Sequence, residues 1–135
     1  MYLCEKLIVK DGSSYEMAEC FPFATRMQDR LTALGYREIT LSADSPIGKA
    51  GLVARGHEFH YSRLQDEIKP SDCDPQNENV FREVYQATDR TGKARSCPGY
   101  LTNRCLGSYV HLHFKSSPAI GKNFVSACLA YRKER

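Results

Sequence analysis

Two short stretches of the sequence carry the residues best suited to chemistry. Residues 55–62 read RGHEFHYS and residues 108–114 read SYVHLHF, and together they hold all four histidines of the chain. Imidazole and carboxylate groups at this spacing can bind zinc or iron. They can also move protons for a nucleophilic cysteine or serine. A third interpretation is structural, with the histidines hydrogen-bonded beneath a sheet surface. The residues alone leave all three open.

Alternation along a strand predicts which of these side chains share a face. In an extended chain, residues two apart point the same way. Glu58 and His60 therefore share one face of the first stretch, and His57 lies on the opposite face. In the second stretch, Tyr109, His111 and His113 are expected on one polar face. The residues between them form the opposite, apolar face.

The six cysteines do not form a recognisable metal or redox motif. None belongs to a C-x-x-C pair, and no secretory signal precedes them, which favours free thiols in a reducing cytosol. Cys4 and Cys128 fall at apolar positions of helical spacing and are expected to be buried, unreactive thiols. Cys105 lies near Gly107, and nothing in the sequence assigns it a role.

The elements that must position these residues can be outlined from periodicity. Helical spacing predicts a first helix over residues 2–9 and a last one over 117–131, with Ser117 as N-cap and Pro118 in its first turn. Phe124, Val125, Cys128 and Leu129 form the apolar face of that last helix. Between the helices, about five strands with short turns predict antiparallel pairing. They are expected within these ranges: 15–24, bent or edged by Pro22, 36–43, 52–64, 80–89 and 100–114. Residues 26–36 fit a helical turn or a strand start, and residues 65–79 a long polar loop.

Composition and charge exclude several classes of function. The chain has 135 residues, 41% hydrophobic and 26% charged, which suits one globular domain. A net charge of +3 without a basic cluster argues against nucleic acid as a partner. No apolar run is long enough to cross a bilayer, so we expect a cytoplasmic protein without membrane contact. No Walker-type glycine loop is present to grip ATP phosphates.

Five motifs, taken in order, resemble the glutaminase domain of the cobyrinic acid a,c-diamide synthase family. They are LGY at 34–36, SPIGKAG at 45–51, RGHEFHYS, SYVHLHF, and SPAIGKNFVSAC at 117–128. The resemblance implies an α/β fold: part of a three-layer α/β/α glutamine amidotransferase-like domain with a mixed, largely antiparallel sheet and flanking helices. It also implies that residues 1–135 are one truncated domain. The parts expected to be missing are the segment with the nucleophilic cysteine, which would end just before MYLCEKLIV, and the ATP-binding synthetase domain.

The resemblance also implies a function and its residues. The full-length enzyme would release ammonia from glutamine and amidate the a and c acetate side chains of a corrin ring in cobalamin biosynthesis. His111 is matched to the catalytic histidine, while Glu58, His60, Tyr109 and His113 are placed in the active-site neighbourhood. No cofactor or metal is expected on this chain, and ATP and Mg would bind the absent synthetase domain. Glutamine and the corrin would be met through the full-length enzyme. We expect this chain alone to be inactive, and to form a homo-oligomer or to associate with the missing N-terminal part.

Two alternatives stay open at this point. The chain could belong to an amidase for another tetrapyrrole, such as sirohaem or nickel-sirohydrochlorin, because the ring would be bound largely by the missing domain. It could also be a non-catalytic binding or scaffold module that completes its sheet by dimerisation or by pairing with a second polypeptide that carries the nucleophile.

Overall fold

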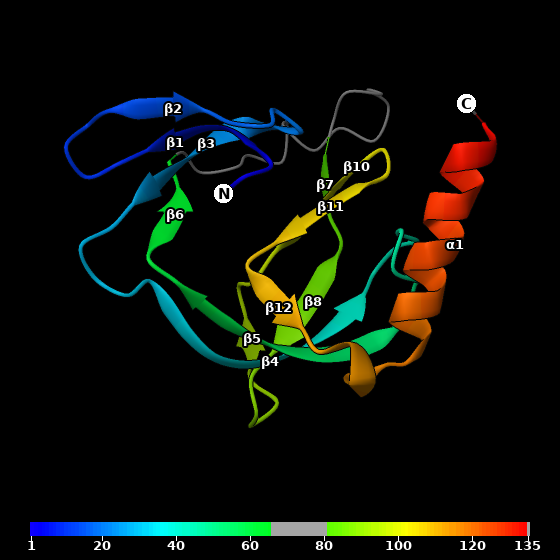
Figure 1. Ribbon diagram of the computed structural model, residues 1–135. Coiled ribbons are helices and arrows are strands. Elements are labelled where there is room, and N and C mark those ends of the chain that lie inside the picture. The colour runs from blue at the N-terminus through cyan, green and yellow to red at the C-terminus, as the bar shows by residue number, and fades with distance from the viewer. Residues whose placement is uncertain (66–80, 135) are drawn as a thin grey trace.

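Strands dominate the computed structural model, which describes residues 1–65 and 81–134 (Figure 1). The described strands form three sheets, and most neighbouring strands run antiparallel. One long α-helix follows them. The mixed α/β class and the largely antiparallel pairing are therefore confirmed, with less helix in the described ranges than expected.

The five-stranded sheet carries both histidine-rich stretches. Its order is β12-β5-β4-β8-β9, and every neighbouring pair is antiparallel. The bounds are β12 Val110–Leu112, β5 Val53–His60, β4 Ala33–Leu41, β8 Tyr85–Thr88 and β9 Ala94–Arg95. Along β5, exposed and buried residues alternate. The half-buried strand predicted at 36–43 is confirmed, and β4 also shows that a strand starts before residue 36. The single strand predicted at 52–64 is only partly right, because it divides after His60 into β5 and a second strand, Ser62–Leu64, which belongs to another sheet.

A four-stranded sheet contains the N-terminal part of the chain. Its order is β2-β1-β3-β6, with bounds β2 Ser14–Glu16, β1 Cys4–Ile8, β3 Phe21–Met27 and β6 Ser62–Leu64. Strands β1 and β3 are parallel, and their register shifts between the pairs Cys4↔Phe21 and Lys6↔Ala24. Pro22 lies at this irregularity, where its missing N–H costs no regular ladder bond. The structure thus shows an irregular register at Pro22, within a strand that has neighbours on both sides.

A three-stranded sheet and the helices complete the described fold. Its order is β11-β10-β7, with bounds β11 Cys105–Ser108, β10 Gly99–Thr102 and β7 Arg82–Glu83. A 3-10 helix, η2 Phe114–Ser116, leads into α1 Ala119–Lys133. The apolar stretch at 100–114 thus forms three strands rather than the one or two expected, because the chain turns sharply at 103–104 and leaves its partner again after Ser108.

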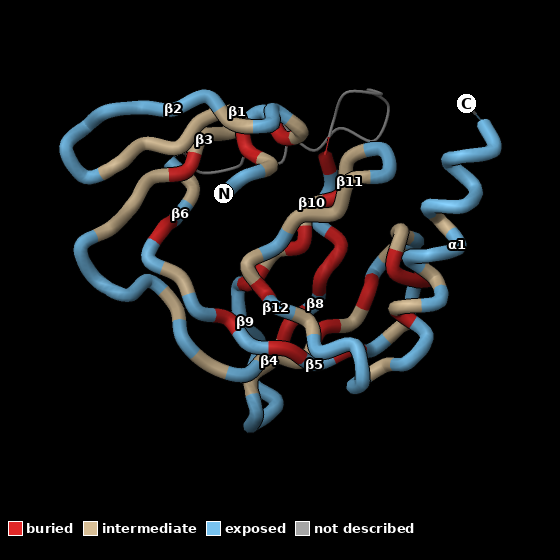
Figure 2. Tube along the Cα trace, viewed as in Figure 1, coloured by how far each residue is buried: buried red, intermediate tan, exposed pale blue. Residues whose placement is uncertain are grey.

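The main core lies on the inner face of the five-stranded sheet, against β10 and the start of α1 (Figure 2). Its buried apolar residues come from elements far apart in the sequence: Ile39, Leu41, Ile47, Ala54, Val84, Tyr85, Ala87, Cys97, Leu101, Val110 and Ile120. Two of the five motifs meet at its edge, where the Asn123 side-chain amide donates to the Ile47 carbonyl over 3.0 Å. The helix is therefore tied to the turn at 45–51.

The helix predicted over residues 2–9 is wrong, because this segment is strand β1. An isolated helix this short gains little on its own. As a strand, β1 hydrogen-bonds β2 on one side and β3 on the other, and only Cys4 within it is fully buried. Pairing with distant segments has overridden the local helical spacing.

The last helix is confirmed, but two of its expected details are wrong. Its N-cap is Pro118 without a side-chain cap, while the Ser117 carbonyl accepts from the Ile120 N–H over 3.0 Å. Ile120 is its buried residue, whereas Phe124, Val125 and Leu129 are about half exposed and Cys128 is exposed. The helix meets the core only near its N-terminal end, and Phe124 and Cys128 of its apolar stripe line an open pocket instead of a packed interface.

The predicted polar loop and the expected lack of a membrane-spanning segment remain to be compared with the structure. The polar loop predicted at 65–79 lies, after Gln65, outside the described residues. Within residues 1–65 and 81–134, no helix is long and apolar enough to cross a membrane.

Candidate active site

His111 lies on the outer face of the five-stranded sheet, directly opposite His57. The two residues are Cα partners in the antiparallel pairing of β12 with β5. Their rings meet edge to face with centroids 4.8 Å apart, and His111 Nδ1 lies 3.3 Å from His57 Nε2. Both residues are exposed. In such a contact one ring nitrogen donates and the other accepts, so each imidazole fixes the tautomer of the other.

Gly56 is what lets β12 lie close enough for this contact. A Cβ atom added at Gly56 would lie 2.3 Å from the His111 carbonyl oxygen and 3.0 Å from Leu112 Cα. Both atoms belong to the backbone and cannot rotate away. The glycine of RGHEFHYS is therefore explained by backbone approach next to His57.

The outer face continues onto β4. Tyr36 is the partner of His57 in the β4–β5 pairing and is 75% exposed. Beside this row lies a polar pocket of about 460 Å³, lined by Tyr36, Arg55 and Gly56 among others. The row Tyr36–His57–His111 is thus accessible to a molecule or segment approaching the sheet from outside.

Glu58 points the opposite way and lies at the centre of a buried polar network. The residue is only 4% exposed. Its Oε2 atom accepts from Arg37 Nε at 3.0 Å and Arg37 Nη2 at 2.9 Å, and from the Cys97 thiol at 2.9 Å. Its Oε1 atom lies 2.9 Å from His60 Nε2. A buried carboxylate is stable only with such partners.

The charge and hydrogen bonds around Glu58 decide its ionisation. Burial by itself raises the pKa of this carboxyl group. The hydrogen bonds from Cys97 and His60 and the positive charge of Arg37 outweigh that cost, so the net pKa lies below its ordinary value. Glu58 is therefore an ionised structural anion at neutral pH rather than a proton donor.

His60 connects this network to the segment before β12. Its Nδ1 lies 2.6 Å from the Ser62 carbonyl, so both ring nitrogens face acceptors. The ring stacks on Tyr109 with centroids 3.8 Å apart and an interplanar angle of 12°. The Tyr109 hydroxyl in turn lies 2.7 Å from Ser62 Oγ. These contacts hold the β5–β6 corner against the chain just before β12.

The predicted site residues therefore separate into two groups. Glu58, His60 and Tyr109 lie together on the inner side, whereas His111 lies outside with His57. The expected shared face of Tyr109, His111 and His113 is wrong, because Tyr109 lies outside β12 and escapes its alternation. His113 is exposed just after β12, where its backbone N–H donates to the Arg55 carbonyl at 2.8 Å.

Four residues of these two clusters were not singled out from the sequence: His57, Arg37, Cys97 and Ser62. His57 was placed correctly on the face opposite Glu58, but only the pairing of β5 with β12 brings it to His111. For Arg37, the signal was a charged residue on the apolar side of an alternating strand. Cys97 lies 39 positions from Glu58 and carried no comparable signal.

The cysteines of the described ranges are engaged away from the histidine pair. No cysteine within residues 1–65 and 81–134 forms a hydrogen bond with either imidazole. Burial raises the pKa of the Cys97 thiol to about 11, and its hydrogen bond to Glu58 adds to the rise. Cys4 is buried as expected, and burial raises the pKa of its thiol, whereas the expectation for Cys128 is wrong because that residue is exposed.

The metal interpretation finds two ligands but not a third. The described residues hold no group of three or more histidine, cysteine, aspartate or glutamate side chains arranged to bind a metal ion. The Nδ1 of His111 and the Nε2 of His57 already face each other. The geometry suits proton transfer better than metal binding.

Comparison with known proteins gives a consistent result. Residues 1–119 match the profile of the CobB/CobQ-like glutamine amidotransferase domain. The cobyrinate a,c-diamide synthase of Priestia megaterium is 35% identical over 135 residues, which is 100% of this chain and 26% of that protein. Those of Syntrophotalea carbinolica and Thermoplasma volcanium are each 37% identical, over 95% and 100% of this chain and 26% and 27% of those proteins. The chain thus spans about a quarter of the length of the curated relatives it matches.

Proposed function

Because the chain belongs to the CobB/CobQ-like glutamine amidotransferase family, we propose that it supplies the catalytic histidine of a glutaminase site in a cobyrinate a,c-diamide synthase. The family match and the names of the similar proteins support the reaction class. The observation that carries the residue assignment is the contact between His111 and His57 on an accessible sheet face. The whole enzyme would use ATP to couple glutamine hydrolysis to amidation of the a and c carboxylates of its corrin substrate.

In this proposal His111 acts as the base and His57 as its positioning residue. When His111 Nδ1–H donates to His57 Nε2, the Nε2 atom of His111 carries a lone pair and can accept a proton from a thiol. The thiolate attacks the side-chain amide carbon of glutamine, and His111 returns the proton to the departing ammonia. Water then hydrolyses the glutamyl thioester. Backbone N–H groups near the nucleophile would stabilise the oxyanion.

The nucleophilic thiol would come from another part of the synthase. The described cysteines do not hydrogen-bond the histidine pair, and Cys97, the one within the Glu58 network, has a raised pKa. The outer face around His111 exposes Tyr36 and Phe59, so a covering segment would find apolar contact there. We therefore propose that residues 1–135 are a partial amidotransferase domain and that this chain alone does not hydrolyse glutamine.

Glu58, His60 and Tyr109 would support the site without touching substrate. Their contacts join β5, β6 and the segment before β12 from beneath the sheet. These contacts would fix the position of β12 relative to β5, and hence the contact between the His57 and His111 imidazoles. His113, exposed and at the end of β12, would have at most a peripheral role.

ATP and magnesium are assigned to a different part of the synthase. The sequence contains no Walker-type glycine loop, and the described residues offer no cluster of metal ligands. We therefore propose that both act elsewhere in the full-length enzyme.

A chimeric enzyme tests the proposal directly. Residues 1–135 would replace the matching segment of the Priestia megaterium synthase, to which they align over 135 residues. The assays are glutamate release, glutamine-dependent amidation of cobyrinate, and amidation with ammonium salt. We expect His111→Ala to reduce the two glutamine-dependent rates by about 10²–10⁴-fold, as for the loss of a general acid–base group. The ammonium-dependent rate should stay unchanged, because it bypasses the glutaminase site.

The matched control is His113→Ala, which removes the nearest histidine two residues away. It should keep glutamine-dependent activity within about threefold, since its side chain lies outside the proposed machinery. Retained glutamine-dependent activity in His111→Ala, or glutamate release by the isolated chain, would overturn the assignment. Amidation of sirohydrochlorins instead of cobyrinate would favour the tetrapyrrole alternative, and loss of all activity in the unsubstituted chimera would favour a scaffold role.

A further inference from the structure

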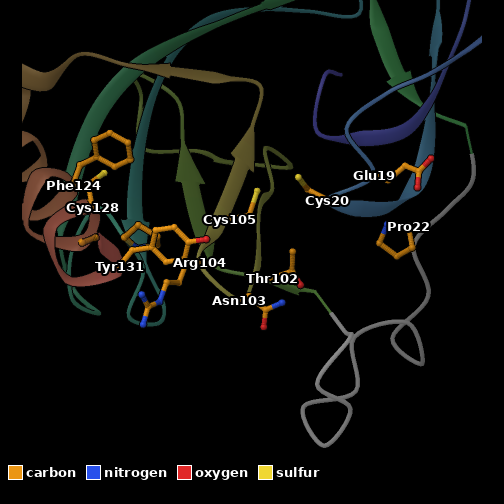
Figure 3. A pocket seen from close by; sticks show the side chains of 12 residues that line it. Glu19, Cys20, Pro22, Thr102, Asn103, Arg104, Cys105, Phe124, Cys128 and Tyr131 are labelled. Carbon is orange, nitrogen blue, oxygen red and sulfur yellow. The ribbon is translucent and has the colours of Figure 1, made fainter. Parts of the chain in front are cut away.

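Cys20 and Cys105 come together from two different sheets on the wall of a pocket (Figure 3). Cys20 directly precedes β3 of the four-stranded sheet, and Cys105 begins β11 of the three-stranded sheet. Their side chains point toward one another in Figure 3, and the Cys20 thiol donates to the Ala18 carbonyl over 3.7 Å. Both residues are half-buried, which keeps them near solvent without making them mobile surface groups.

Backbone hydrogen bonds hold Cys20 in place on both sides. The Glu19 N–H donates to the Cys4 carbonyl at 3.0 Å, and the Phe21 N–H donates to the Leu3 carbonyl at 2.9 Å. Glu19 itself adopts a left-handed conformation with φ of 52°. The chain is therefore pinned immediately before and after the thiol.

Cys105 is fixed just as closely by a tight hairpin. It pairs with Thr102 across the turn between β10 and β11, and Asn103 in that turn has φ of 48°. Asn tolerates the left-handed region better than most residues, so Asn103 suits this position of the turn. The two thiols thus meet through ordered backbone on both sides.

The two sheets approach each other closely beside this thiol pair. A Cβ atom added at Gly107 would lie 2.7 Å from Phe21 Cε2. Phe21 also packs edge-on against Phe81 and Tyr100, with ring centroids 6.2 Å and 6.3 Å away. This aromatic cluster joins the two sheets independently of the cysteines, next to the place where the two thiols face each other.

The pocket gives small molecules access to the pair. Its volume is about 670 Å³, and its far wall is formed by α1, where Cys128 and Tyr131 line it. Burial, followed by the neighbouring Cys20 thiol, raises the pKa of Cys105 to about 11. Both thiols line this pocket and can be reached by a small reagent that enters it.

We propose that Cys20 and Cys105 form a reversible intrachain disulfide by exchange with a low-molecular-weight disulfide such as oxidised glutathione. The thiolate of one of the two cysteines attacks one sulfur of the reagent, breaks its S–S bond and releases one glutathione thiolate, which takes up a proton. The other cysteine thiol, losing its proton, then attacks the protein sulfur of this mixed disulfide and expels the second glutathione. Two protein thiols are oxidised, and one small disulfide is reduced to two thiols.

The experiment uses the full chain in buffers with graded ratios of reduced to oxidised glutathione. After acid quenching and alkylation, peptide mapping by mass spectrometry identifies each linked pair. We expect the Cys20–Cys105 cross-link to exceed glutathione adducts by about tenfold or more, because the second thiol faces the first on the same pocket wall and acts at high effective concentration. Excess reduced glutathione or dithiothreitol should reverse it. The peptide map of the unsubstituted chain identifies the linked cysteines by itself, so this test does not depend on a variant that folds.

Matched variants separate this pair from the other cysteines. Cys20→Ser and Cys105→Ser should each abolish the cross-link, and Cys105→Ser should accumulate the glutathione adduct on Cys20. Cys128→Ser, in the same pocket, and Cys73→Ser, outside the described residues, should leave the cross-link intact. A cross-link through Cys73 or Cys128, disulfides between chains, or adducts without an intrachain bond would each overturn the proposal.

Discussion

Glu58 offers the sharpest test of the structure, through the substitution Glu58→Gln. The change keeps the size of the side chain and removes its charge. Arg37 and His60, whose side chains are each only 11% exposed, would then lose the anion that balances them. The amide NH₂ group would also face donors from Cys97 or His60, which it cannot satisfy.

The expected loss of stability follows from the burial of these partners. Removing one member of a buried charged network costs about 3–5 kcal/mol, because an uncompensated buried charge is left behind. With a urea m-value of about 2 kcal/mol per M, the unfolding midpoint should fall by roughly 2 M. The total stability of a domain is about 5–15 kcal/mol, so the variant would keep only part of it.

A matched control lies on the neighbouring strand. Glu38 pairs with Arg55 at 2.7 Å, but these side chains are 40% and 75% exposed. Glu38→Gln should therefore cost only about 0–1 kcal/mol. Both variants would be compared with the unsubstituted chain by urea unfolding followed by circular dichroism at neutral pH. Equal, small effects of the two substitutions would refute the buried network.

The pH dependence gives an independent reading of the same network. Since the folded-state pKa of Glu58 is lowered from its ordinary value of 4.5, its ionised form stabilises the fold fully above that value. This contribution is lost as the pH falls through the lower folded-state pKa. The stability difference between the unsubstituted chain and Glu58→Gln should accordingly shrink below about pH 4. A difference that stays constant from neutral to acidic pH would show that the carboxylate charge is not involved.

Three further predictions follow from burial and close contact. Cys97 should react with iodoacetamide far more slowly than Cys128 at pH 8 in the folded chain, because its pKa is raised to about 11 and it is buried; equal rates by peptide mapping would contradict this. Ile120→Ala should cost about 2–5 kcal/mol in urea unfolding, since Ile120 is 0% exposed. Val125→Ala, at 56% exposure on the same helix, should change stability by less than about 0.5 kcal/mol. Gly56→Ala should destabilise the fold by about 1–3 kcal/mol and shift the histidine resonances in NMR spectra, because the new methyl group meets the backbone of β12; unchanged spectra would argue against the close approach.

Much of the fold follows from local pattern. The alternation in RGHEFHYS predicts strand β5 and assigns Glu58 and His57 to opposite faces, as the structure confirms. The turn residues at 45–51 and the proline-initiated last helix are likewise local features. The failure at residues 2–9 has a physical cause: Leu7 and Ile8 fit either periodicity, and only hydrogen bonds to β2 and β3 favour the strand.

The sequence by itself determined the class of the fold, the faces of its central strands and, through five motifs in order, the family. Tertiary structure alone decided which faces meet. Strand alternation repeats every two residues and gives no information about which distant strand lies alongside, or in what register. The pairing of β5 with β12 places His57 against His111, and the core encloses Glu58 with Arg37 and Cys97. The two histidines on either side of Glu58 in the sequence therefore lie in separate places. His60 belongs to the buried network around Glu58, and His57 faces outward beside His111.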